Sequence, residues 1–272
     1  MSRRSPAAIA PSRATQIVAL AIFGAIFAIP IIGMIEFSLR AGLSGGYTLD
    51  HWVTVLGGQM PAAYQKPLVG GILNSLLIAI LTSAIVLVIL VPTQVLVHLR
   101  FPKLRRLLEF ICLLPITIPA IVLVVGLAPV YSVLARMFGS GAWTLCFAYG
   151  ILVLPYAYRA IQSNLTAVDL HTLTEASRTL GANWLITMWT VVLPNIRRGL
   201  VAASFITVAV VLGEYTIALL LNRQNLQTAI VMISKFDPFA PVIVALLALA
   251  FGFVLLLVLG RISAPRTPRK KK

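Results

Sequence analysis

Residues 169–194 read DLHTLTEASRTLGANWLITMWTVVLP and form a polar, helix-patterned stretch between two long apolar runs. Asp169 is a residue type that favours the N-cap of a helix. Gly181 suits the position just past a helix C-terminus, where the backbone adopts a positive φ. Asn183 is suited to cap a second helix, and Pro194 is expected to stop it. The stretch therefore predicts a hairpin of two short helices around a glycine turn.

The predicted hairpin carries an apolar stripe that a loop in water would leave uncovered. Helical spacing puts the following residues along it: Leu170, Leu173, Ala176 and Leu180 on the first helix, and Trp184, Thr187, Met188 and Val191 on the second. A merely structured loop is the plain alternative. Because an uncovered apolar stripe marks an interaction surface, a docked partner is the better interpretation.

The composition indicates an integral membrane protein. Hydrophobic residues make up 60% of the chain and charged residues 11%, whereas a soluble domain is about half apolar and about a quarter charged. Six runs are long enough to cross a bilayer core of about 30 Å. They lie near residues 17–37, 69–97, 107–130, 142–161, 200–221 and 238–260. The first run is too long for the apolar part of a signal peptide, so we expect it to be a retained span.

The basic residues predict the orientation of these spans. The formal net charge is +15, but Lys and Arg gather at the ends of apolar runs, which argues against nucleic-acid binding. Of the 22 basic residues, 17 fall on one side of the membrane: Arg3, Arg4, Arg13, Arg100, Lys103, Arg105, Arg106, Arg159, Arg178, Arg197, Arg198, Arg261, Arg266, Arg269, Lys270, Lys271 and Lys272. By the positive-inside rule, both termini and residues 162–198 are cytoplasmic, and residues 38–67 are outside. The terminal basic cluster is expected to anchor the chain on acidic lipid.

The hairpin resembles the EAA loop of permease subunits in binding-protein-dependent ABC importers. The family pattern is Glu-Ala-Ala, three residues, Gly, nine residues, an aliphatic residue, one residue and Leu-Pro. The chain matches this spacing with Glu175, Ala176, Ser177, Gly181, Val191, Leu193 and Pro194, and Ala182 follows the glycine. Ser177 in place of the second alanine is the one departure, and it replaces one small residue with another.

Further segments resemble the same family. Asn74-Ser75-Leu76 opens the second span as Asn-Ser-Leu does there, and LPITIPAIVLVVGL from Leu114 is similar to the third span of polyamine, sulfate, thiamine and ferric-iron permeases. Gly213-Glu214-Tyr215 resembles the Gly-Glu-Phe/Tyr of polyamine-type permeases. The family often has glycine where this chain has Pro92. The resemblance is good over residues 69–261 and weaker before them.

The resemblance implies an all-α membrane protein with six transmembrane helices, a MetI-like type I importer fold and a cytoplasmic EAA coupling helix. We expect an N-terminal part (1–68: tail, first span and outer loop), a permease core (69–261) and a basic tail (262–272). The implied location is the bacterial inner membrane. Two ATP-binding subunits would dock on Asp169, Glu175, Ala176, Ser177, Gly181, Ala182, Leu193 and Pro194, and a second permease subunit and an external substrate-binding protein would complete the importer.

The chain is expected to bind no cofactor and to have no catalytic residues of its own. It has no G-x-x-x-x-G-K-[ST] phosphate loop, so ATP and Mg would be used by the partner ATPase subunits. The histidines, at 51, 98 and 171, have no metal or triad spacing, and the two cysteines, Cys112 and Cys146, lie in apolar runs and are interpreted as small hydrophobes.

Glu214 is the strongest candidate for a substrate contact, because a carboxylate inside a membrane span is costly and usually functional. A structural hydrogen bond to a neighbouring span is the alternative, and both interpretations stay open. Tyr215, Asn74 and Thr117 are weaker pathway candidates. Glu214 and the branch resemblance favour a polyamine-like cation, with ferric iron, thiamine, sulfate or a phosphonate as alternatives.

Other transport classes fit less well. A secondary transporter would show more spans and an inverted repeat, and a channel would show a filter-like loop or a charged ring. The paired Pro115 and Pro119 predict a bend in the third span, which either serves packing or lines a pathway.

Overall fold

The computed structural model describes residues 12–42, 45–235 and 237–263, and these residues form helices with no β-strand among them. The longer helices are α1 (Arg13–Leu39), α3 (Ala62–Leu99), α5 (Ala120–Phe138), α6 (Leu145–Ala167), α9 (Leu193–Gly213) and α12 (Phe239–Ser263). The shorter ones are α2 (Asp50–Leu56), α4 (Arg105–Leu113), α7 (Leu170–Thr179), α8 (Trp184–Thr187), α10 (Thr216–Leu220) and α11 (Leu226–Ile233). The terminal arginines and lysines at positions 3, 4, 266 and 269–272 lie outside the described residues.

The prediction of an all-α protein with six spans is confirmed. Six helical segments are long and apolar enough to cross a membrane: Arg13–Leu39, Ala62–Leu99, Ala120–Phe138, Ala142–Ala167, Trp184–Gly213 and Phe239–Val258. Pro30, Pro92, Pro129 and Pro155 lie inside these helices without ending them. Neighbouring helices and local adjustments tolerate such prolines in membrane proteins.

The third span differs from the prediction. Residues 107–130 are not one helix, because α4 ends at Leu113 and a short 3-10 turn, Leu114–Thr117, follows. Ile118 is extended (φ −102°, ψ 120°), as expected for a residue that precedes proline. Pro119 then caps α5, which is the apolar span. The proline pair therefore breaks the span completely, where the sequence predicted a bend.

The fifth span also has different bounds. The sequence predicted a helix over 200–221, but the helix ends at Gly213 and Glu214 has an extended backbone. A short helix, α10, follows the break and packs against α5. Glu214 therefore lies at a helix end and not inside a continuous span.

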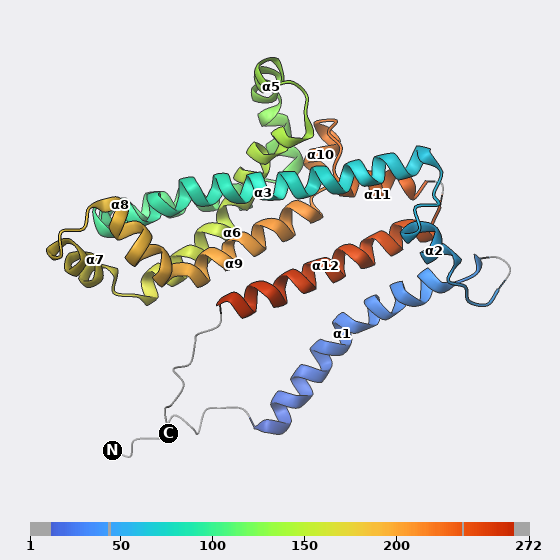
Figure 1. Cartoon of the computed structure of the whole chain (residues 1–272), viewed down its shortest axis with the longest axis horizontal. Coiled ribbons are helices and arrows are strands. Elements are labelled where there is room, and N and C mark those ends of the chain that lie inside the picture. The colour runs from blue at the N-terminus through green and yellow to red at the C-terminus, as the bar shows by residue number, and fades with distance from the viewer. Residues whose placement is uncertain (1–11, 43–44, 236, 264–272) are drawn as a thin grey trace. The chain divides into compact units, whose positions relative to one another are not determined.

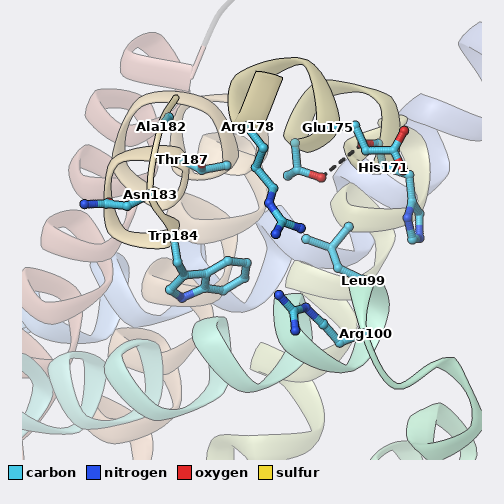
Figure 2. A pocket seen from close by; sticks show the side chains of 10 residues that line it. Leu99, Arg100, His171, Glu175, Arg178, Ala182, Asn183, Trp184 and Thr187 are labelled. Atoms are coloured by element: carbon cyan, nitrogen blue, oxygen red, sulfur yellow. Dashed lines mark hydrogen bonds between the residues drawn. The ribbon is translucent and has the colours of Figure 1, made fainter. Parts of the chain in front are cut away.

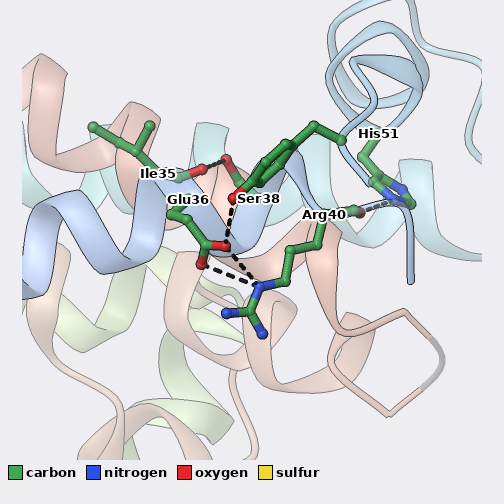
Figure 3. Close-up of polar contacts among 6 residues, drawn as sticks. Ile35, Glu36, Ser38, Arg40 and His51 are labelled. Carbon is green, nitrogen blue, oxygen red and sulfur yellow. Dashed lines mark hydrogen bonds and ion pairs between the residues drawn. The ribbon is translucent and has the colours of Figure 1, made fainter. Parts of the chain in front are cut away.

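The chain divides into two compact units. The first comprises the described residues up to Met60 together with Ile233–Leu249, which include α1, α2 and the start of α12. Figure 3 shows its polar contacts: Arg40 pairs with Glu36 at 2.9 Å, and the Tyr47 hydroxyl donates to the same carboxylate at 3.3 Å. The His51 ring stacks on Phe239 with centroids 4.1 Å apart. These contacts hold the short α2 beside the end of α1.

The second unit comprises Pro61–Met232 and the chain from Ala250 onward, and it contains the 169–194 hairpin. Helices α3, α6 and α9 pack against one another along their lengths (Figure 1). Helix α6 is the most buried of the six spans. A buried cluster joins these helices to the hairpin, because Leu170, Met188 and Val192 share it with side chains such as Val95 and Ile161. The hairpin is therefore fixed to the membrane helices by apolar packing.

A second buried cluster lies further along the same helices. It brings together Ile78 of α3, Val124 of α5, Tyr149 of α6 and Ile217 of α10. The hydroxyl of Tyr131 on α5 donates to the Thr144 carbonyl at 2.9 Å and accepts from the Ala148 amide at 3.1 Å. This cluster attaches the broken third and fifth spans to the central helices.

Gly199 permits a close approach between α6 and α9. A Cβ at this position would lie 2.9 Å from the Ala160 carbonyl oxygen and 2.9 Å from Asn164 Cβ. Such distances are shorter than carbon atoms tolerate, so a side chain would push the two helices apart. The most extensive helix contact in the protein thus depends on a missing side chain.

We predict that Gly199→Ala lowers the thermal stability of the detergent-purified protein, by about 1–3 kcal/mol, because overpacking forces backbone shifts. The matched control is Gly126→Ala in α5, where an added Cβ meets nothing within 4 Å. Helix propensity alone would raise stability at both positions. Equal melting shifts in the two variants would contradict the close-approach argument.

Candidate functional site: the 169–194 hairpin and the break at 214–225

The first helix of the hairpin begins at the predicted cap. The Asp169 carboxylate accepts hydrogen bonds from the Thr172 amide at 3.3 Å and the Thr172 hydroxyl at 2.7 Å. These two bonds hold the pKa of the Asp169 carboxyl below its ordinary value. The cap therefore stays ionised at neutral pH and satisfies amide donors at the start of α7.

The turn after α7 requires glycine. Gly181 has φ +84°, its amide donates to the Arg178 carbonyl at 2.9 Å, and the Ala182 amide donates to the Ser177 carbonyl at 3.1 Å. This is the Schellman pattern of a helix C-terminus, in which a left-handed residue satisfies the last carbonyls. The predicted glycine turn is confirmed.

The second helix also begins at its predicted cap, but it does not stop at Pro194. Asn183 Oδ1 accepts from the Ile186 amide at 2.9 Å and starts α8. A π-helical stretch, Met188–Val192, follows, and the chain continues directly into α9. A wider turn relieves the clash that a proline ring makes with the preceding turn of an α-helix. Leu193 and Pro194 thus lie within one continuous helical segment, Trp184–Gly213, where the sequence predicted a stop.

A buried hydrogen bond joins the two hairpin helices. The hydroxyls of Ser177 and Thr187 lie 3.0 Å apart, and both side chains are buried. From the sequence, Ser177 was expected to take part in docking as a small residue in place of alanine, and no partner was predicted for its hydroxyl, because a pair ten residues apart across a turn has no periodic signal. The serine links α7 to α8 in a way that alanine would not.

The predicted apolar stripe divides into a buried and an exposed part. Leu170 is fully buried with Thr174 and Ser177 on the face of α7 that contacts the protein. Leu173, Ala176 and Leu180 point away from it, and the Leu180 side chain is 88% exposed. On the second helix Thr187 and Met188 are buried. The hairpin therefore has one face that packs on the spans and one apolar face that nothing in its own unit covers.

A pocket of about 280 Å³ lies between the end of α3 and the hairpin. Figure 2 shows Arg100, Glu175, Arg178 and Trp184 around it. Glu175 is exposed, and Ala182 and Asn183 form part of the rim. The structure thus brings the acidic residue of the Glu175-Ala176-Ser177 motif, the residues after Gly181 and the last turn of α3 to one place.

Glu214 has a local structural contact at the break after α9. Its Oε1 accepts from the Ile217 amide at 2.7 Å, so the carboxylate satisfies the start of α10. The side chain is partly buried. This contact is structural but local, whereas the structural alternative from the sequence was a hydrogen bond to a neighbouring span. Tyr215 precedes α10 at its N-cap position.

Asn225, which sequence reasoning missed, is the centre of this break. Its side-chain amide donates to the Glu214 carbonyl and to the Tyr149 hydroxyl, the latter at 3.1 Å. Its Oδ1 accepts from the Thr228 amide at 2.9 Å, and the Thr228 hydroxyl accepts from the Asn225 amide at 2.9 Å. The Asn-x-x-Thr spacing before an apolar run is a reciprocal capping signal, by analogy with the capping box, and could have identified it.

The other pathway candidates lie in different surroundings. Asn74 on α3 donates to the Gln224 carbonyl at 3.0 Å, and the neighbouring Ser75 accepts from the Leu226 amide at 2.8 Å. Asn74 and Glu214 are therefore connected through residues 224–225. Thr117 is exposed, and its hydroxyl donates to the Leu114 carbonyl in its own turn at 2.7 Å. No hydrogen bond in the described part of the chain connects Thr117 to Glu214.

Comparison with known proteins agrees with this arrangement. Residues 95–269 match the family described as "Binding-protein-dependent transport system inner membrane component". The match includes the hairpin and the break, and it covers more than half of the chain. The chain belongs to this family. The chain is thus the inner membrane component, or permease, of a binding-protein-dependent transport system.

One curated relative of the permease covers nearly all of the chain. The permease is 28% identical over 267 residues to "Probable ABC transporter permease protein y4fN" of Sinorhizobium fredii (strain NBRC 101917 / NGR234). The match covers 91% of this chain and 45% of that protein. The permease therefore spans about half the length of the curated relative that it matches.

We predict that Glu214→Gln keeps the stability of the permease, because an amide oxygen also accepts from the Ile217 amide. Glu214→Leu leaves that amide without its partner and should lower stability by about 1–3 kcal/mol. Thermal melting of the detergent-purified protein measures both effects. A melting temperature in Glu214→Leu equal to that of the unmodified permease would contradict the capping role.

Proposed function

We propose that this permease is the membrane subunit of an ATP-driven, binding-protein-dependent importer, and that ATPase subunits dock on its 169–194 hairpin. The observation that carries the proposal is the hairpin itself. It is capped at both helix starts, packed on the spans through Leu170, Met188 and Val192, and apolar on its exposed face. A surface of this kind is suited to a protein partner.

The continuous helix from Trp184 to Gly213 supports a mechanical role for the hairpin. The π-helical stretch and Pro194 do not interrupt it, so a displacement of the docked hairpin would move the whole span. The Ser177–Thr187 hydrogen bond would make α7 follow α8. ATP-driven closure of the partner subunits would then reorient the spans by rigid-body motion and give alternating access.

The partners that we propose are two ATPase subunits, a second permease unit and an external substrate-binding protein. ATP and Mg would be held by the ATPase subunits, and the permease would have no catalytic residue of its own. The second permease unit is supported by the length of the curated relative, of which this chain covers 45%. A protein of that length has room for two such units.

The proposed cargo is a small solute, with a polyamine-like cation as the first candidate. The resemblance of the Leu114 and Gly213-Glu214-Tyr215 segments to polyamine-type permeases supports it. Ferric iron, thiamine, sulfate or a phosphonate are the alternatives. The capping bond of Glu214 weakens the electrostatic argument for a cation, because one carboxylate oxygen already serves the backbone. Uptake by Glu214→Gln separates a substrate contact from a purely capping role of Glu214, since only a cation pathway requires the negative charge of the carboxylate.

We predict that Leu180→Asp or Glu175→Lys abolishes ATP-driven uptake and ATPase association while the permease still inserts and folds. Both side chains are exposed on α7, so the substitutions alter the docking face and not the core. The measurements are copurification of the ATPase and uptake in reconstituted vesicles. Lys103→Glu is the matched charge-reversal control, because this exposed residue lies outside the hairpin. Unaltered uptake in both hairpin variants would refute the docking role.

We predict that the hairpin is cytoplasmic and the loop before α3 is external, in a bacterial inner membrane with both termini cytoplasmic. Single cysteines at the exposed positions Thr179 and Gln59 test this prediction in sealed cells with an impermeant thiol reagent. Cys112 and Cys146 are buried and give little background labelling. Only Gln59→Cys should be labelled, and labelling of Thr179→Cys from outside would reverse the topology.

A further inference from the structure

The pocket between α3 and the hairpin holds two cationic groups without a bonded counter-charge. Arg100 follows the end of α3 and Arg178 lies on α7, and Figure 2 shows both guanidinium groups directed into the same space beside the Trp184 ring. Among the residues that the structure describes, neither guanidinium has a hydrogen-bond or ion-pair partner. Glu175 and His171 also line the pocket, so one carboxylate offsets part of the positive charge.

The pocket lies where two membrane spans end. Leu99 is the last residue of the apolar helix α3, and Trp184 is the first residue of the helix that runs to Gly213. Both residues line the pocket. Both helices are longer than the about 20 residues that cross a bilayer core, so these two ends extend past the core into the headgroup region and the aqueous phase. The pocket is therefore placed to meet lipid phosphate as well as solutes of the aqueous phase.

The chemistry of the pocket selects an oxyanion. A guanidinium is a planar fork of donors that matches the oxygens of a phosphate, and two such groups facing one cavity repel each other until an anion lies between them. Basic pockets between membrane helices on the cytoplasmic side bind anionic lipid headgroups. We propose that the pocket binds the phosphate group of an anionic phospholipid, with Arg100 and Arg178 as donors and the Trp184 ring beside the headgroup.

The bound lipid adds a polar link to elements that already pack together through apolar side chains. Arg100 belongs to the end of α3, Arg178 to α7 and Trp184 to α8, so one headgroup ties the second span to both helices of the hairpin. The lipid thereby stiffens the connection between the hairpin and the membrane helices. This role goes beyond transport, and its main measurement, lipid binding to the permease alone, requires neither an ATPase nor a substrate.

The test measures lipid binding to the full chain in detergent by native mass spectrometry. Dioleoylphosphatidylglycerol is compared with dioleoylphosphatidylcholine over a concentration series. We expect the unmodified permease to retain phosphatidylglycerol preferentially, and Arg100→Gln and Arg178→Gln each to weaken its binding about tenfold, as for the loss of one charge-assisted contact. Arg197→Gln is the matched control, because this exposed arginine does not line the pocket. It should bind phosphatidylglycerol like the unmodified permease.

Three results would overturn the proposal. The first is equal phosphatidylglycerol binding in the arginine variants and the control. The second is complete displacement by inorganic phosphate at millimolar concentration, which would assign the pocket to a soluble anion. The third is loss of bound lipid on addition of an ATPase subunit whose own binding requires both arginines, which would assign it to a protein. If a glutamine variant does not fold, Arg178→Lys takes its place, since it keeps the charge but not the fork, and it should bind less tightly than the unmodified permease.

Discussion

Backbone polar groups in apolar surroundings must find partners within the protein, and this constraint explains the breaks in the permease's helices. Where the fifth span ends, the Glu214 side chain accepts from Ile217, and Asn225 donates to the Glu214 carbonyl. Gln227 donates to the Leu212 carbonyl at 2.8 Å near the end of α9. Each polar side chain at the break therefore replaces a hydrogen bond that a continuous helix would have made. The break is held in a defined shape and is not a loose loop.

The same constraint applies to the hairpin, where capping side chains and the glycine turn satisfy the helix ends. Asp169 and Asn183 satisfy the first amides of α7 and α8, and the turn at Gly181 satisfies the last carbonyls of α7. Because the local hydrogen bonds are complete, the apolar face of the hairpin is free to contact another molecule. Leu180, at the end of α7, is among the most exposed large hydrophobic side chains of the described residues.

Helix packing connects the hairpin to the break at 214–225. Both lie along the bundle of α3, α6 and α9, and the two buried clusters share α3, α6 and α9. Helix α9 runs without interruption from the π-helical stretch that precedes Pro194 to the break at Glu214. A change at the hairpin therefore has a direct structural route to the residues around Asn225. The pocket that Arg100 and Arg178 line lies at the start of this route, between the end of α3 and the hairpin.

Sequence patterns were enough to predict an all-α membrane protein with six spans, the caps at Asp169 and Asn183 and the turn at Gly181, but they did not predict where the third and fifth spans break. Composition, apolar run length and capping chemistry depend on short stretches of sequence, so they can be recognised without knowing the tertiary structure. The tertiary structure alone decided the helix breaks and their partners. Pro194 does not stop its helix because a π-helical turn accommodates the ring, and the apolar helix of the third span begins only after Pro119, which follows the extended Ile118. The contacts of Ser177 with Thr187 and of Asn225 with Tyr149 depend on which residues distant in sequence are packed together. No periodic pattern encodes such pairs, because they arise from the crossing of helices and not from the order of residues within one helix.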